Sequence, residues 1–198
     1  MIHKVRRDDE HRYWVPAARP RDGEERRPGY SEICDDLGIV KPNPFYTPEG
    51  REEGVALHAW LGHLARGLTA KVAPDPRIAG RVAGIQKFLR DTGFRIMGGE
   101  TPMYDPINRF ACTPDLFGTM NKMLWVIDAK RGGKLPSHRL QTGAQFIALR
   151  SNGVRVQKRA SLYLRDNDYR LEEHTDTMDM ARWGIFVSTH HLKKEYTS

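Results

Sequence analysis

Hydrophobic and polar residues follow two patterns along this chain, one typical of helices and one typical of strands. Apolar residues recur every three or four positions in several long segments, as they do on the buried face of an amphipathic helix. A shorter segment also fits a helix, with Ser31 as its candidate N-cap, and Ser137 is the candidate N-cap of a longer one. The expected helices cover residues 31–37, about 51–67, 77–92, about 138–150 and about 177–191.

Shorter apolar runs, rich in β-branched and aromatic residues, indicate strands between the helices. Asn121-Lys122 separates two of these runs and is a plausible hairpin turn, as is Asn167-Asp168. The main elements follow in the order helix, helix, three strands, helix, two strands, helix. This order predicts an α/β fold with a mixed, mostly antiparallel central sheet flanked by helices. The expected strands cover residues 94–99, 110–118, 123–131, 154–164 and 169–173.

The run from Met123 to Arg131 changes character at its end, where charged residues follow a strongly apolar strand. Side chains alternate faces along a strand, so Asp128 and Lys130 point to the same side, roughly 6.6 Å apart along the chain. A carboxylate and an amine are costly to bury there without partners, which suggests a functional site. Antiparallel pairing with the preceding strand would place Asp115 near this end, where Pro114 would interrupt the ladder.

Glu100 follows two glycines at the end of the strand expected over residues 94–99. Glycine lets a backbone or a ligand approach closely, so Glu100 is a candidate for the edge of the same site. In the absence of a metal, crowding Asp115, Asp128 and Glu100 together is unfavourable. We expect this crowding to raise the pKa of at least one carboxyl group.

Composition sets bounds on the class of protein. With 198 residues, 39% of them hydrophobic and 29% charged, the chain is expected to form one soluble globular domain over residues 30–198. Residues 1–29 are polar and of mixed charge, and are expected to form a solvated N-terminal arm. A DNA-contacting arm is the alternative, which the interleaved acids disfavour. No apolar run reaches the roughly 20 residues needed to cross a membrane, and no signal peptide is evident.

Charge and cysteine content bear on partners and compartment. The net charge of +7 favours a polyanionic partner such as nucleic acid, although many basic proteins bind nothing charged. Cys34 and Cys112 are too few for a disulfide framework or for an iron–sulfur cluster held by four cysteines. A reducing cytoplasm is therefore the expected location.

Five motifs of the chain, given at the end of this paragraph in sequence order, resemble those of the RecB-like branch of the PD-(D/E)XK nuclease superfamily. The similarity covers roughly residues 30–190, and Gln145 stands where that branch usually has a tyrosine. By itself His58 would be interpreted as a histidine of the core; within this order of motifs it is interpreted as functional. The motifs are Gly54-Val-Ala-Leu-His58, Glu100 at a strand end, Thr113-Pro-Asp115-Leu-Phe-Gly118, Val126-Ile-Asp128-Ala-Lys130-Arg-Gly132 and Leu140-Gln141-Thr-Gly-Ala-Gln145.

The resemblance implies a restriction-endonuclease-like core and a metal-dependent DNA nuclease. Within the branch, the chain looks most like phage-type exonucleases and the related mitochondrial genome-maintenance exonuclease, which implies phosphodiester hydrolysis in recombination, repair or DNA processing. It also implies one or two Mg²⁺ or Mn²⁺ ions, no iron–sulfur cluster, and single- or double-stranded DNA bound without sequence specificity. A recombination or single-strand-binding protein is a further candidate partner, with no membrane partner. The expected location is the cytoplasm of a bacterium or of a phage-infected host cell.

Two alternative functions stay open. One is a catalytically degenerate nucleic-acid-binding or assembly protein on the same fold, and the other is an endonuclease of the restriction type. The intact trio Asp115, Asp128 and Lys130 favours an active nuclease over a degenerate one. Exonuclease and endonuclease share their chemistry and differ in their use of linear and closed-circular DNA.

The resemblance also assigns roles to residues. Lys130 would orient or activate the attacking water, and Gln141 would position the nucleophile or Lys130. His58 would be an additional metal ligand, better suited to Mn²⁺ than to Mg²⁺. The predicted catalytic residues are Asp115, Asp128, Lys130, Gln141 and Glu100. The predicted metal ligands are Asp115, Asp128, the backbone carbonyl of Ala129, His58 and Glu100. The residues predicted to contact phosphates are Arg131, Lys134, His138 and Arg139.

Overall fold

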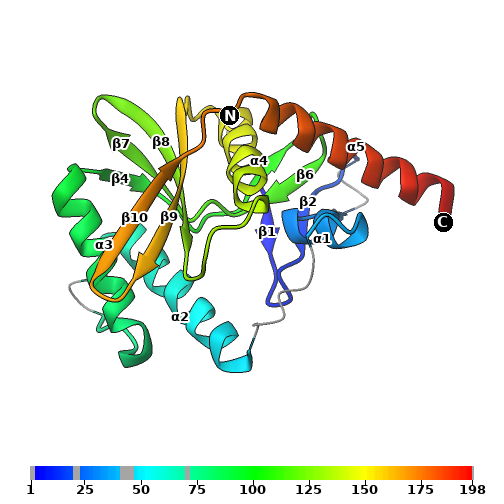
Figure 1. Cartoon of the computed structure of the whole chain (residues 1–198). Helices are drawn as coiled ribbons and strands as arrows, with labels where there is room; N and C mark the ends of the chain where they lie inside the picture. Colours follow the sequence, from blue (N-terminus) through cyan, green and yellow to red (C-terminus); the bar gives the residue numbers. More distant parts are fainter. Residues whose placement is uncertain (1–2, 20–22, 41–46, 70–71, 198) are drawn as a thin grey trace.

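The computed structural model describes residues 3–19, 23–40, 47–69 and 72–197 (Figure 1). Among these residues, no helix combines the length and the apolar character needed to cross a lipid bilayer. The strands are β1 (Arg6–Arg7), β2 (Tyr13–Pro16), β3 (Glu24–Arg27), β4 (Arg95–Gly98), β5 (Met103–Asp105), β6 (Phe110–Cys112), β7 (Leu116–Met120), β8 (Met123–Lys130), β9 (Lys158–Arg165) and β10 (Asp168–Glu173). The helices are α1 (Tyr30–Asp36), α2 (Pro48–Ala65), the 3₁₀ turn η3 (Pro76–Ile78), α3 (Ala79–Thr92), α4 (Ser137–Ser151) and α5 (Met178–Thr197).

A five-stranded sheet in the order β10-β9-β8-β7-β4 forms the centre of the fold. β8 pairs with β9 in parallel, and the other neighbouring strands run antiparallel. Helices α2 and α3 pack against one face of the sheet, while α4 and α5 belong to the apolar cluster on the other (Figure 1). The prediction of a mixed, mostly antiparallel sheet flanked by helices is therefore confirmed.

The middle strand of the sheet, β8, is buried on both faces, which explains its almost continuous apolar sequence. Trp125, Ile127 and Ala129 pack in the hydrophobic cluster under α2 and α3. Val126 packs in the other cluster, together with residues of α4 and α5. Because side chains alternate along a strand, Asp128 also faces α4.

The turn predicted at Asn121-Lys122 joins β7 to β8. Both turn residues have positive φ angles, of 51° and 62°, as in the two-residue turns that match the twist of an antiparallel hairpin. The register pairs Leu116 with Ile127. Asp115 precedes Leu116 and Asp128 follows Ile127, so the hairpin brings the two aspartates to the same end, as predicted.

The strand predicted over residues 110–118 is wrong in one respect, because it is two strands. β6 pairs with β5 in a separate two-stranded sheet, and only β7 joins the central sheet. The break lies beside Pro114, which has no N–H to donate to a ladder. The three residues of the break, 113–115, include Asp115 of the candidate site.

Two predicted helix caps are also wrong. Ser31 and Ser137 do not cap α1 and α4, which have Gly29 and Pro136 at the N-cap, without a side-chain hydrogen bond. In contrast, α2 starts earlier than predicted, because the side chain of Thr47 caps it and a proline occupies its first turn.

Residues predicted to form a polar arm contain a small antiparallel sheet, β1-β2-β3. Tyr13 and Val15 of β2 are buried, and the Ala111 N–H donates to the carbonyl oxygen of Pro28 at 3.0 Å. A Cβ on Gly29 would lie 2.9 Å from Cε2 of Tyr13, so glycine permits this contact. The N-terminal sheet therefore rests on the segment that precedes β7, while the domain boundary at residue 29 stays a prediction.

Two glycines allow a matched test of this packing. Gly118 lies where β4 and β7 pair, and a Cβ there would overlap the carbonyl oxygen of Arg95. Gly118→Ala should force the strands apart and lower the free energy of unfolding by about 1–3 kcal/mol. In α2, a Cβ on Gly54 would meet no atom within 4 Å, so Gly54→Ala should raise the free energy of unfolding by up to about 1 kcal/mol. Urea unfolding followed by circular dichroism measures both, and equal effects would contradict this explanation.

Candidate functional site

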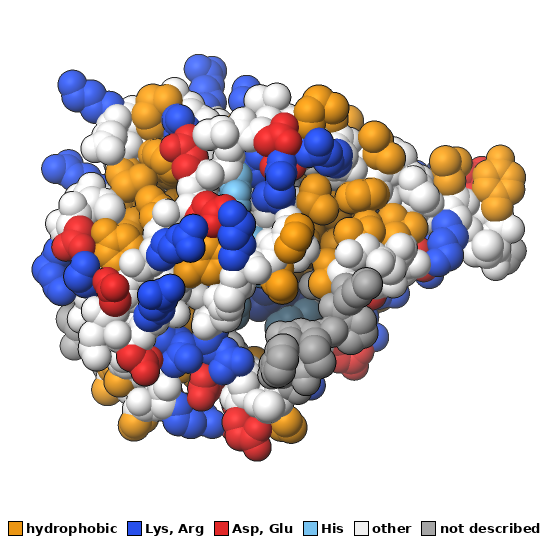
Figure 2. All heavy atoms as spheres, viewed as in Figure 1, with side chains coloured by type: hydrophobic (Ala, Val, Ile, Leu, Met, Phe, Trp, Pro, Cys, Tyr) orange, Lys and Arg blue, Asp and Glu red, His pale blue; other side chains and the backbone are white. Residues whose placement is uncertain are grey.

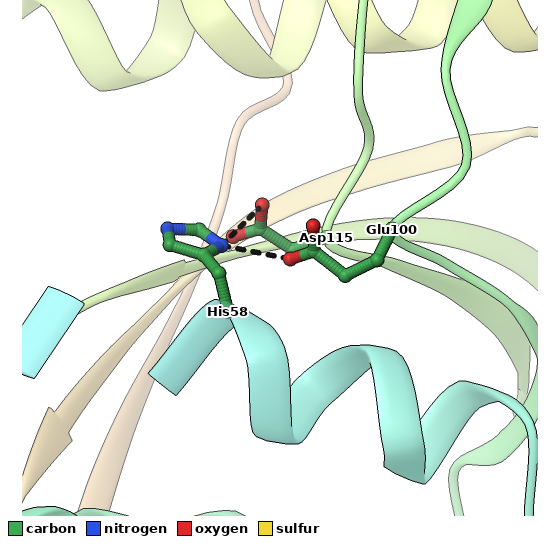
Figure 3. A group of neighbouring side chains, drawn as sticks. All are labelled: His58, Glu100 and Asp115. Atoms are coloured by element: carbon green, nitrogen blue, oxygen red, sulfur yellow. Dashed lines mark hydrogen bonds and ion pairs between the residues drawn. The ribbon is translucent and has the colours of Figure 1, made fainter. Parts of the chain in front are cut away.

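Three side chains from three separate segments of the chain meet beside the end of β4 and the start of β7 (Figure 3). His58 comes from α2, Glu100 follows β4, and Asp115 precedes β7. Nδ1 of His58 lies 2.7 Å from Oε1 of Glu100 and 3.5 Å from Oδ1 of Asp115. One ligand atom from each residue lies within 4.8 Å of the other two, an arrangement that could hold a metal ion.

The backbone around Glu100 explains how two acidic residues come so close. A Cβ on Gly99 would overlap the carbonyl oxygen of Asp115, so only glycine fits there without displacement. The Glu100 N–H donates to the carbonyl oxygen of Pro114 at 2.8 Å, and Glu100 itself has a φ of 47°. The close approach predicted from the glycines before Glu100 is confirmed.

The electrostatics of this group follow from burial. Asp115 is only 3% exposed, and this burial raises its pKa above the ordinary range, with the charges of Asp128 and Glu100 acting in the same direction. The negative charge of Asp115 in turn raises the pKa of His58 to about 9, with help from Glu100. The prediction that at least one carboxyl pKa is raised is confirmed, although burial is a larger cause than crowding. Near neutral pH a protonated His58 supplies positive charge at this place.

A second set of contacts joins β8 to α4. Oδ1 of Asp128 accepts a hydrogen bond from Nε2 of Gln145 at 2.9 Å, and Oδ2 lies 2.6 Å from Nζ of Lys130. Nζ of Lys130 donates to Oε1 of Gln141 at 2.7 Å. The structure thus brings Asp128, Lys130 and Gln141 together in one chain of contacts.

The backbone of β8 links the two sets of contacts. Oδ2 of Asp115 accepts a hydrogen bond from the N–H of Ala129 at 2.7 Å. Asp128 is not a member of the group of three potential ligands, and its carboxylate contacts Lys130 and Gln145. Its role as a metal ligand, like that of the Ala129 carbonyl, stays a prediction.

Gln145 is the residue that sequence reasoning missed. It departs from the tyrosine expected at that position, and no role was assigned to it. In the structure it is 1% exposed and holds the fully buried carboxylate of Asp128. The available signal was its spacing of four residues from Gln141, which places both amides on the same stripe of a helix that must pack on β8.

The four residues predicted to contact phosphates are all engaged within the protein. Arg131 pairs with Glu53 at 2.6 Å, Lys134 pairs with Glu172, and Arg139 pairs with Asp179 and Asp176. The fourth, His138, is 8% exposed and has Nδ1 3.1 Å from the hydroxyl of Tyr163. Burial lowers the pKa of His138 to about 4, so it carries no charge near neutral pH. The structure gives these residues internal partners that the sequence did not reveal.

A cavity of about 550 Å³ opens over the group of three. Its walls come from β1, β2, α1, α2 and α4, and they include His58, Glu100 and Asp115 together with Gln141 and Gln145. None of the four predicted phosphate-contacting residues lines it, among the part of the chain that the structure describes. Figure 2 shows a hollow in one face of the molecule, with Lys, Arg and histidine side chains visible inside it. The walls also include residues of the N-terminal sheet, among them Arg7 and Tyr13.

Comparison with known proteins identifies the fold. No protein-family model matches the chain, and neither does any curated protein sequence. Among solved structures, an alkaline exonuclease (LHK-Exo) from Laribacter hongkongensis is similar, with a TM-score of 0.50 and 14% identity over 86% of this chain and 89% of that chain. LHK-Exo in complex with dAMP matches with a TM-score of 0.50 and 15% identity over the same shares of both chains. At this identity the likeness shows that the two proteins share an α/β fold.

The buried His138 predicts a particular dependence of stability on pH. Its pKa is lowered from 6.5 to about 4, so between these values the unfolded chain binds a proton that the folded protein does not. Stability is therefore lost as the pH falls through this range. From pH 7 to pH 5, the free energy of unfolding of the parent should fall by up to about 2 kcal/mol more than that of His138→Gln. Urea unfolding at both pH values measures this, and equal losses in the two proteins would contradict the assignment.

Proposed function

We propose that this protein is a divalent-metal-dependent deoxyribonuclease of the RecB-like branch of the PD-(D/E)XK superfamily, acting as an exonuclease. The observation that carries the proposal is the meeting of two sets of residues at one end of the β7–β8 hairpin. One set, His58, Glu100 and Asp115, could hold a metal ion. The other set extends from Asp128 through Lys130 to Gln141. A cation site beside a lysine at the floor of a cavity suits the hydrolysis of an anionic backbone.

The residues present fit a hard divalent cation. Two carboxylates offer oxygen atoms, the ligands that Mg²⁺ prefers, and the imidazole of His58 extends the choice to Mn²⁺. The raised pKa of the buried Asp115 shows that its negative charge is costly without a positive partner. The protonated imidazole of His58 meets that need here, and a metal bound by the same three residues would meet it more fully.

The chemistry that a divalent cation supplies at such a site is activation of water and neutralisation of phosphate charge. The side chains of this chain have complementary roles in the proposal. Lys130 would donate hydrogen bonds to the attacking water or to the phosphate, where negative charge develops. Gln141 fixes Nζ of Lys130 through its amide oxygen. Gln145 orients the carboxylate of Asp128, which faces Lys130 from the other side.

The exonuclease assignment, rather than the endonuclease alternative, is supported by the fold shared with an alkaline exonuclease and by the order of the motifs. We further propose DNA without sequence preference as the substrate and a role in phage-type recombination, repair or DNA processing. Degradation of labelled linear DNA, with closed-circular DNA left intact, would support an exonuclease. Cleavage of the closed circle would favour a restriction-type endonuclease, and no cleavage of either would favour a binding protein.

Loss of single site residues should abolish cleavage. Asp115→Ala, Asp128→Ala and Lys130→Ala should each reduce the rate by at least about a hundredfold, the scale of one positioned catalytic group. His58→Ala and Gln141→Ala should also be harmful, by more variable amounts. The measurement is digestion of labelled linear DNA with Mn²⁺ and with EDTA, and the control is Asp91→Ala, which removes an exposed partner of Lys87. If Asp128→Ala is folded by circular dichroism and digests DNA at the parent rate, the site is wrongly assigned.

Metal binding should be visible without any substrate. A ligand that binds only the folded state, at about a hundred times its Kd, raises the free energy of unfolding by about 2.7 kcal/mol. Mn²⁺ should therefore raise the melting temperature of the parent and of Asp91→Ala, but not that of Asp115→Ala. His58→Ala should lose more of the shift with Mn²⁺ than with Mg²⁺, because imidazole suits Mn²⁺ better. Equal shifts for the parent and Asp115→Ala would exclude Asp115 as a ligand.

A further inference from the structure

Two arginines of the cavity wall stand out because they lack an acidic partner. Arg7 and Arg66 both line the cavity, and neither forms an ion pair with a carboxylate among the residues that the structure describes. The basic residues predicted to contact phosphates differ, since Arg131, Lys134 and Arg139 each have such a partner. A guanidinium group without an internal carboxylate is free to bind one from outside, or a phosphate.

Arg66 lies at the end of α2, one helical turn beyond Gly62. A Cβ on Gly62 would lie 3.4 Å from a guanidinium nitrogen of Arg66 and 3.5 Å from Cβ of Glu100. The same small patch of α2 therefore has Arg66 on one side and a member of the candidate metal group on the other. This places a positive charge next to the acidic floor of the cavity.

Arg7 approaches the cavity from β1, and the N-terminal sheet holds it there. The hydroxyl of Tyr13 lies 3.1 Å from Oγ1 of Thr113, which is two residues before Asp115. Arg7 lies opposite Tyr13 in the register of the antiparallel β1–β2 pair. Arg7, Tyr13 and Thr113 thus connect the N-terminal sheet to the backbone that carries Asp115.

The turn between β1 and β2 also borders the cavity. His11 lies in this turn, with a φ of 61°, and lines the cavity. Burial lowers its pKa, and the nearby charges of Arg7, His58 and Arg51 lower it further. Two acids of the turn are occupied within the hairpin, Asp8 by Trp14 and Arg12 and Glu10 by Arg12. The positive charge of the cavity wall therefore comes from the guanidinium groups of Arg7 and Arg66, beside the imidazole of His58.

We propose that Arg7 and Arg66 bind the phosphate backbone of a DNA strand in the cavity, with the β1–β2 hairpin as one wall of the binding site. This inference rests on the proposed function and assigns a substrate-binding role to the N-terminal sheet. The bare carboxylates of the floor repel a phosphate, and the two guanidinium groups offset that repulsion from the walls. They hold the strand over the floor by contacts that are independent of base sequence.

Binding in EDTA tests this inference separately from cleavage. Fluorescence anisotropy with a short labelled DNA, measured at several salt concentrations, gives the affinity and the slope of log affinity against log salt. Arg7→Ala and Arg66→Ala should each weaken binding by about tenfold at a fixed salt concentration. Each should also reduce the salt slope by about 0.7 to 0.9, the change expected for one lost phosphate contact.

The matched control is the neighbouring residue. Arg6 lies beside Arg7 in β1, but it pairs with Glu24 at 2.5 Å and does not line the cavity. Arg6→Ala should keep the affinity and the salt slope of the parent. Arg7→Lys, which keeps the charge, should restore most of the slope.

The outcomes distinguish the inference about Arg7 and Arg66 from the proposed nuclease function. Parent-like affinity and slope in Arg7→Ala and Arg66→Ala would overturn the inference, as would an equal loss in Arg6→Ala. Cleavage that depends on Asp128, combined with parent-like binding in both arginine variants, would leave the proposed function intact. Binding that depends on both arginines without any cleavage would overturn the function and retain the inference.

Discussion

The carboxylates of Asp115 and Asp128 are buried, and the rest of the site supplies the partners that a buried charge requires. Their exposed fractions are 3% and 0%, and a buried negative charge is tolerated only with positive partners and hydrogen-bond donors. Asp128 has Lys130 and an amide from α4, while Asp115 has the imidazole of His58 and a backbone N–H of β8. The packing of α2 and α4 on opposite faces of the sheet brings these partners to one end of the hairpin.

The parts of this arrangement that could be predicted from sequence are those with short-range causes. Alternation along β8 places Asp128 and Lys130 on one side, and the two-residue turn at Asn121 returns Asp115 to them. Gln145 could not be assigned in this way, because its role depends on how closely α4 packs on β8. The ion pair of Arg131 with Glu53 spans two distant segments of the chain, so a basic residue beside the motif was interpreted as a phosphate contact.

The N-terminal residues illustrate a limit of charge patterns. Their interleaved acids and bases predicted a solvated arm, whereas several of these charges neutralise one another, as Arg6 and Glu24 do. The apolar anchor consists of Tyr13 and Val15 in a strand of four residues, which is too short for its alternation to stand out in a sequence. The net charge of the chain likewise does not indicate where a polyanion would bind. Most basic side chains of this site region are already paired, and only a few face the cavity.

The parallel pairing of β8 with β9 has a consequence for the connection that follows β8. Parallel strands need a crossover, and α4 is that crossover as well as the source of both amides of the site. Residues 131–136, most of them exposed, form the loop from β8 to α4. A residue added to or removed from α4 ahead of Gln141 would turn both amides by about 100° and carry them away from their partners, whereas an exposed loop can absorb a change of length. The chemistry of the interior therefore constrains the first turn of α4 more tightly than the loop before it.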